Sequence, residues 1–179
     1  MGVERLEEEL LNVFSGLYLF EVENFVIPHV NSFLELIAHL NAWYKKHHGH
    51  DILRIIVYSG HAASAGTTSD RWDLALQGPK LDWWEVRKAM KQSAYFADTC
   101  FIFDCCSAGS LALGDEDGDE LIAAASWNST AVAAMPWSFT QALVDTLVDL
   151  KGAPATLAQI YATLLLSLIN EREEEERTD

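Results

Sequence analysis

The sequence predicts an α/β fold, in which amphipathic helices pack against a mostly parallel β-sheet. Residues 52–59 and 99–104 are nearly continuous apolar runs, as expected of strands that are buried on both faces of a sheet. Around these runs, apolar residues recur at the spacing of amphipathic helices. Strands that alternate with helices favour parallel pairing, because a parallel connection needs a long crossover.

The individual elements follow from local patterns. Leu6, Leu10, Val13 and Phe14 predict a first helix that ends near residues 15–16. Residues 18–27 (YLFEVENFVI) are aromatic and β-branched and stop at a proline, which predicts a strand. Later in the sequence we expect a helix over about 30–46, strands over 52–59, 99–104 and 121–125, and a loop over 62–80. Asp82 is expected to cap a further helix that turns Trp83, Val86 and Met90 inward. Two more helices are predicted by apolar residues at helical spacing, first Phe139, Leu143 and Leu147, and then Leu157, Ile160, Leu164 and Leu168.

The length of 179 residues suits one domain with a single core. We expect this domain to cover residues 1–170. Residues 171–179 are strongly charged and are expected to fray or to continue as an acidic tail or linker.

The chain is acidic, with 27 acidic and 12 basic residues and a formal net charge of −15. Such a surface repels phosphate groups, so we expect neither nucleic acid nor an anionic membrane as a partner. The acidity suits a cationic substrate, although solubility is the simpler explanation of it.

The three cysteines cannot all pair, and two of them are neighbours, so no disulfide framework is visible. This favours a reducing, cytoplasmic location. The N-terminus (MGVERLEEELL) carries four glutamates and does not resemble a secretory signal. No apolar window reaches the roughly 18 residues of a membrane span, so we expect a soluble protein with no membrane span.

Reactive residues follow two of the predicted strands. Tyr58-Ser59-Gly60-His61 ends one, and Asp104-Cys105-Cys106-Ser107-Ala108-Gly109 ends the other. Sites in open α/β sheets form at the carboxyl ends of strands, and a thiol beside an imidazole is the minimum for a nucleophile with a base. The alternative is a surface histidine near two buried structural thiols, and these residues alone do not decide between them.

These sequence motifs resemble those of caspases, metacaspases and their fungal relatives, including the CHAT-type group of clan CD cysteine peptidases. YSGHA at one strand end precedes FDCCSAG at a later one, and His61 and Cys106 are 45 residues apart, close to the roughly 50 expected of caspases. KLDWWEVRKAM, ELIAAASWNSTA and SFTQAL extend the resemblance over most of residues 18–150.

The resemblance implies a cysteine endopeptidase of this thiol protease class. His61 matches the general acid/base, and Asp104, Cys106 and Gly109 match the family word Asp-x-Cys-x-x-Gly, which makes Cys106 the nucleophile. The oxyanion hole would be formed by the backbone N–H groups of Cys106 and Ala62, where the family usually has glycine at the latter position.

The charge of Asp104 argues against a role in activating the nucleophile. An anion close to a thiol raises the pKa of the thiol and hinders its activation, so Asp104 needs another role. By resemblance to metacaspases, it lines the S1 pocket and pairs with a substrate Arg or Lys. The alternative is a strand-end aspartate that caps a loop.

Metal binding has weaker signals. His47, His48 and His50 lie at the predicted end of a helix, where solvated histidines are the simpler explanation. Residues 115–120 resemble half a calcium loop but lack the full pattern, and some metacaspases need calcium. We expect no metal ligand set and no cofactor. The Gly-x-Ser-x-Gly elbow of α/β-hydrolases is not formed around Gly60 or Ser107.

The resemblance also implies a three-layer sandwich whose first and last strands are absent from this sequence. Either a longer chain supplies them or another chain fills the gap. Two functions therefore follow. The first is an endopeptidase that cleaves protein substrates after Arg or Lys, in cell-death or defence signalling. The second is a catalytically silent interaction module that works with other domains of a larger chain.

Overall fold

A computed structural model describes residues 3–60, 63–64, 72–73, 81–92, 97–105, 120–124 and 138–178. The chain divides into two compact units. Residues 1–24 and 131–179 form unit 1, and residues 25–130 form unit 2.

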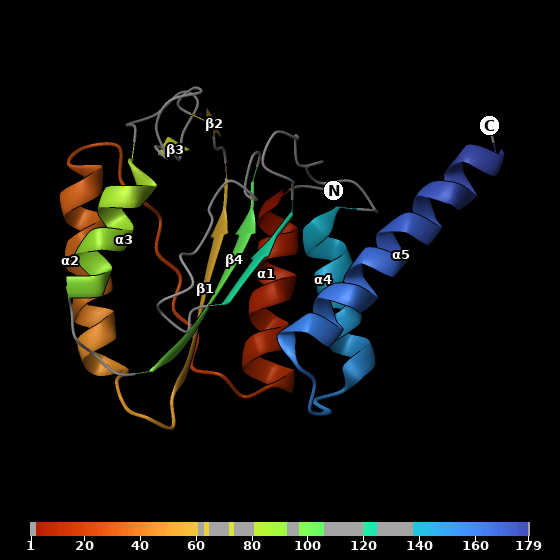
Figure 1. Ribbon diagram of the computed structural model, residues 1–179, viewed down its shortest axis with the longest axis horizontal. Helices are drawn as coiled ribbons and strands as arrows, with labels where there is room; N and C mark the ends of the chain where they lie inside the picture. Colours follow the sequence, from red (N-terminus) through yellow and green to blue (C-terminus); the bar gives the residue numbers. More distant parts are fainter. Residues whose placement is uncertain are drawn as a thin grey trace. The chain divides into compact units, whose positions relative to one another are not determined.

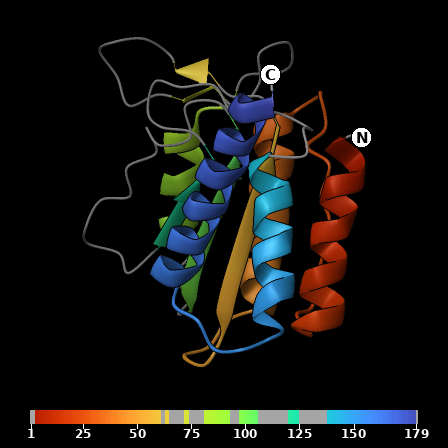
Figure 2. The same ribbon diagram turned by 90° about the vertical axis from the view of Figure 1, so that its right-hand side faces the viewer.

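Unit 1 is helical. It contains α1 (Val3–Asn12), a π-helical turn η1 (Val13–Leu17), α4 (Phe139–Leu150) and α5 (Leu157–Thr178). Figures 1 and 2 show α4 between α1 and α5, and α4 contacts both. The apolar side of these helices is buried at Leu6, Leu10, Phe14, Leu143, Leu147 and Leu164.

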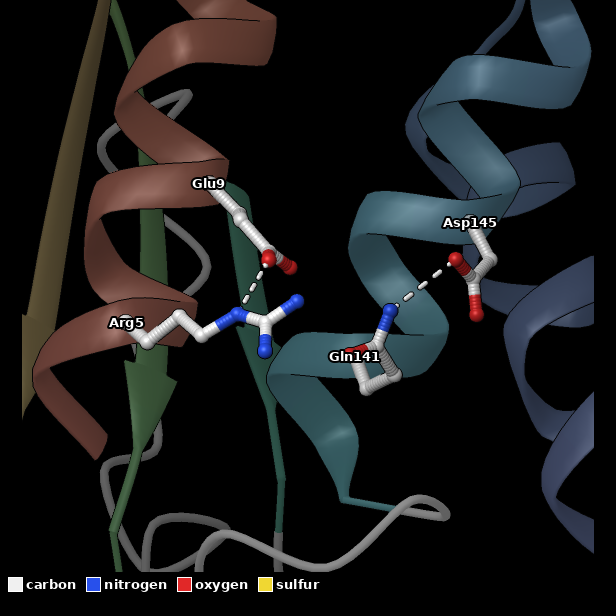
Figure 3. Close-up of polar contacts among 4 residues, drawn as sticks. All are labelled: Arg5, Glu9, Gln141 and Asp145. Carbon is white, nitrogen blue, oxygen red and sulfur yellow. Dashed lines mark hydrogen bonds and ion pairs between the residues drawn. The ribbon is translucent and has the colours of Figure 1, made fainter. Parts of the chain in front are cut away.

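Local interactions define the ends and surfaces of these helices. Ser138 caps α4, because its Oγ accepts a hydrogen bond from Gln141 N at 3.3 Å. On the exposed sides, Arg5 Nε donates to Glu9 Oε1 at 2.8 Å and Gln141 Nε2 donates to Asp145 Oδ1 at 3.0 Å (Figure 3). Such pairs, four residues apart, each stabilise a helix by about 0.2–0.5 kcal/mol.

Unit 2 is built on a parallel three-stranded sheet with the order β1-β4-β5 (Figure 1). The strands are β1 (Leu53–Ser59), β4 (Asp98–Asp104) and β5 (Glu120–Ala123). Two helices, α2 (Ser32–Lys46) and α3 (Trp83–Gln92), contact each other. A short antiparallel pair, β2 (Ala63–Ser64) and β3 (Trp72–Asp73), completes the described elements of this unit.

The core of unit 2 lies between α2, α3 and one face of the sheet. The ring of Trp83 packs edge-on against Phe101 and Phe103, with centroids 5.6 and 4.9 Å away. The whole cluster consists of Leu36, Tyr44, Leu81, Trp83, Val86, Met90, Phe101, Phe103 and Cys105. Asp82 caps α3, because its Oδ1 accepts hydrogen bonds from Trp84 N and Glu85 N at 3.0 and 3.4 Å.

Most of the predicted elements are confirmed, and so is the α/β class with a parallel sheet. The cap at Asp82 and the inward direction of Trp83, Val86 and Met90 are confirmed as well. The predicted strand over residues 18–27 is wrong, since these residues form no helix or strand. Extended backbone becomes a strand only when a neighbour accepts its hydrogen bonds, which a sequence window does not reveal.

Two further expectations are corrected. β4 is buried on both faces, but β1 is not, because Leu53 and Val57 are exposed. The acidic residues 171–178 continue α5 instead of fraying, in keeping with the good helix propensity of Glu and Arg.

Candidate functional site

The carboxyl ends of β1 and β4 lie side by side in the sheet. Ser59 is the register partner of Asp104, and Gly60 N donates a hydrogen bond to Asp104 O at 3.3 Å. Parallel pairing thus brings the two strand ends that carry the candidate residues to one edge of the sheet.

The three residues expected to perform the chemistry directly follow this edge. His61, Ala62 and Cys106 lie outside the described residues, as does Gly109. The last described residues before them are Gly60 on the β1 side and Cys105 on the β4 side.

The β1–β4 register and the spacing of His61 and Cys106 in the sequence share the same offset. Leu53 pairs with Asp98 and Ser59 with Asp104, so every residue of β1 is aligned with the residue 45 positions later. His61 and Cys106 are separated by the same 45 positions. Each of them therefore comes two residues after the last pair of the β1–β4 ladder.

Cys105 is a core residue. Its side chain is 2% exposed and belongs to the apolar cluster under α2 and α3, on the same face as Phe101 and Phe103. It forms no disulfide. A thiol packed in this way has no access to a substrate.

Cys100 is also unsuited to nucleophilic chemistry. Burial raises the pKa of its thiol to about 12, and the negative charge of Glu120, its register partner on β5, acts in the same direction. The thiol therefore stays protonated at neutral pH.

Asp104 is the last residue of β4 and is half-buried. Because side chains alternate along a strand, Asp104 lies on the face of the sheet opposite to Phe103 and Cys105. Its main chain is held in the β1–β4 ladder. The carboxylate is thus attached to a fixed backbone at the edge where the predicted dyad follows.

The ring of Tyr58 lies close to Gly60, a contact that the sequence does not predict. A Cβ added at Gly60 would lie 2.8 Å from Tyr58 Oη, so a larger residue there would force the Tyr58 ring to shift. Burial, and then the negative charge that Cys105 can carry, raises the pKa of Tyr58 above its ordinary range.

The histidines and acidic residues considered above as metal ligands form no metal site in the described part of the chain. No group of three or more His, Cys, Asp or Glu side chains gathers there as a metal site. His48 Nδ1 lies 2.8 Å from the carbonyl oxygen of Lys45, a local contact at the end of α2. The acidic residues 115–119 are outside the described residues.

Comparison of the chain with protein-family models, curated proteins and solved structures finds no match. Among the described residues, no helix is long and apolar enough to cross a membrane.

Proposed function

We propose that this chain is a caspase-like cysteine endopeptidase domain that uses a His61–Cys106 dyad. The observation that carries the proposal is the shared offset of 45 residues between the β1–β4 register and the dyad. Parallel strands lie about 4.8 Å apart, so two residues that leave adjacent strands at the same level start within reach of each other. A thiol and an imidazole in this relation form an activated nucleophile.

In the proposed reaction, His61 takes the proton of the Cys106 thiol, and the resulting thiolate attacks the carbonyl carbon of the scissile peptide bond. The backbone N–H groups of Cys106 and Ala62 stabilise the negative charge that develops on the carbonyl oxygen. His61 donates a proton to the leaving amine, which departs and leaves a thioester on Cys106. A water molecule then adds to the thioester, releases the new carboxyl group and restores the thiol.

Asp104 supplies the preference for Arg or Lys before the scissile bond. A carboxylate near Cys106 disfavours the thiolate, and a substrate cation next to the carboxylate offsets this penalty. The net charge of −15 also favours basic substrates, because it attracts them to the protein. The proposal therefore assigns Asp104 to substrate binding and not to activation of the thiol.

The test compares two neighbouring alanine variants in cleavage of an Arg–amide peptide. Cys106→Ala should abolish kcat/KM, whereas Cys105→Ala should retain most of it, because the Cys105 side chain packs in the core. Thermal unfolding of both variants serves as the control, since Cys105→Ala removes a buried sulfur. Equal loss of activity in two folded variants would contradict the assignment.

A second candidate function is a catalytically silent interaction module. The observation that favours it is the outer edge of β1, which pairs with no described strand and where Leu53 and Val57 are exposed. Absence of cleavage and of Cys106 labelling in the folded chain would select this function.

A further inference from the structure

The helix α5 is apolar on two sides, and one of these sides is exposed. Leu164 is fully buried, and the helix lies beside α4 (Figures 1 and 2). On the other side, Leu166 and Ile169 are 61% and 53% exposed. This side, here called the α5 face, consists of Ala158, Tyr161, Ala162, Leu165, Leu166 and Ile169. Because a helix that is apolar all round is normally buried all round, the α5 face is a candidate contact surface.

The spacing of the α5 face fits another helix. The central residues follow one another at intervals of four, three and four residues, which is the spacing of helices that pack side by side: Ala158, Ala162, Leu165 and Ile169. The two alanines allow a close approach of the partner, and Leu165 and Ile169 supply larger side chains for it to pack against. An extended strand repeats every two residues and does not match this spacing.

The charge of the same helix changes directly after the α5 face. Residues 152–170 contain no charged residue, whereas residues 171–176 are five glutamates and one arginine and still belong to α5. Glutamates three or four residues apart on a helix, such as Glu171 and Glu175, repel one another. Glutamates in the last turn also oppose the helix macrodipole. Positive charge beside this acidic run would relieve both costs, so the helix itself favours a cationic partner.

We propose that the α5 face binds an amphipathic, basic helix of another protein. The apolar side of that helix would contact residues 158–169, and its lysines or arginines would lie against residues 171–176. The charge that selects this partner is on α5 itself, and α1 of the same unit adds four glutamates and one arginine. A second copy is a poorer partner, because parallel pairing would bring two acidic runs together and antiparallel pairing would place each run beside an uncharged half. This inference does not depend on the proposed peptidase.

The test measures binding of a helical peptide to the full chain by calorimetry. The peptide has about 20 residues, enough to form a helix, with leucine and alanine at the spacing of the α5 face and lysines at both ends. The protein carries Cys106→Ala and Asp104→Asn in every measurement, so the proposed peptidase site can neither cut the peptide nor hold its lysines. The peptide should bind, and added salt should weaken the binding. Absence of binding would overturn the proposal.

Two matched peptides separate helix packing from attraction by charge. A scrambled peptide keeps the composition and the charge but has no apolar side, and its affinity should be at least about tenfold lower. A peptide with glutamate in place of lysine keeps the apolar side and should also bind more weakly. Equal binding of the scrambled peptide would mean charge attraction alone, and equal binding of the acidic peptide would exclude a basic partner. Either result would overturn the proposal.

Variants of the protein locate the site. Leu166→Asn and Ile169→Asn change exposed side chains, so both proteins should remain folded in thermal unfolding while the peptide affinity falls at least about tenfold. Leu19→Asn is the matched control, because Leu19 is 82% exposed in the same unit and follows η1, which contacts α1 and α4. This control should leave the affinity unchanged. Unchanged affinity in both α5 variants would overturn the proposal, and so would a dimer of the free protein that Ile169→Asn dissociates, since a second copy would then occupy the face.

Discussion

Neighbouring residues at the end of β4 lie in different environments. Cys105 faces the core under α2 and α3, while Asp104 lies on the opposite face and at the strand end. The alternation of side chains along a strand decides this difference. It supports the choice of Cys106 over Cys105, which the sequence makes only through the resemblance to Asp-x-Cys-x-x-Gly.

Asp104→Asn should lower kcat/KM for substrates with Arg or Lys before the scissile bond by roughly 10²-fold or more, because it removes a charge-assisted hydrogen bond. Asparagine keeps the shape of the side chain and the main-chain bonds to β1. A substrate with a neutral residue at that position is the control and should lose little. Full activity of the variant on basic substrates would show that Asp104 is not the pocket anion.

Cys100 should make stability depend on pH in the alkaline range. Its pKa is raised by burial from 9.0 to about 12, so the folded state holds this proton longer than the unfolded state. The contribution is complete below about pH 9 and is lost as the pH rises towards 12, at up to roughly 1.4 kcal/mol per pH unit. Cys100→Ala should flatten the fall in the free energy of unfolding between these values. Identical pH slopes for the two proteins would contradict this role.

At the level of elements, the sequence predicts what depends on local pattern. The helices α2, α3 and α4 and the strand β4 are set by apolar periodicity and by caps such as Asp82, which are visible in the sequence. Residues 18–27 have the composition of a strand, but they belong to no strand of the structure. The short β2–β3 pair depends on contacts between separate parts of a loop, so no local window indicates it.

The connection between β4 and β5 predicts a single-chain enzyme. Residues 105–150 contain no Lys or Arg, so a protease specific for basic residues has no site there at which to cut itself. Arg172 and Arg177 belong to α5, where cleavage first requires the helix to open locally. Self-processing is therefore expected at Arg71 or Lys80, both of which belong to the loop predicted over residues 62–80.

Intact-mass spectrometry of the active protein shows where the chain has been cut. The expected species are the full chain and fragments that end at residue 71 or 80. Fragments that end between residues 106 and 150, and that are absent from the Cys106→Ala variant, would refute both the single-chain form and the basic specificity.

For the whole molecule, the candidate site depends on register. The sequence places a histidine and a cysteine after two apolar strands, but it does not show that these strands are neighbours or how they align. The structure supplies both facts, with β1 beside β4 at an offset of 45 residues. Long-range pairing of this kind depends on the full set of packing contacts and is not encoded in either strand alone.

The most direct test of the proposed peptidase is labelling of the full chain with an Arg-peptide electrophile, followed by peptide mapping. We expect one label, on Cys106, with Cys100 and Cys105 unmodified because both are buried. An electrophile with aspartate in place of arginine is the matched control and should react much more slowly. No label on Cys106, or equal labelling by the two electrophiles, would contradict the proposed dyad and its preference for basic substrates.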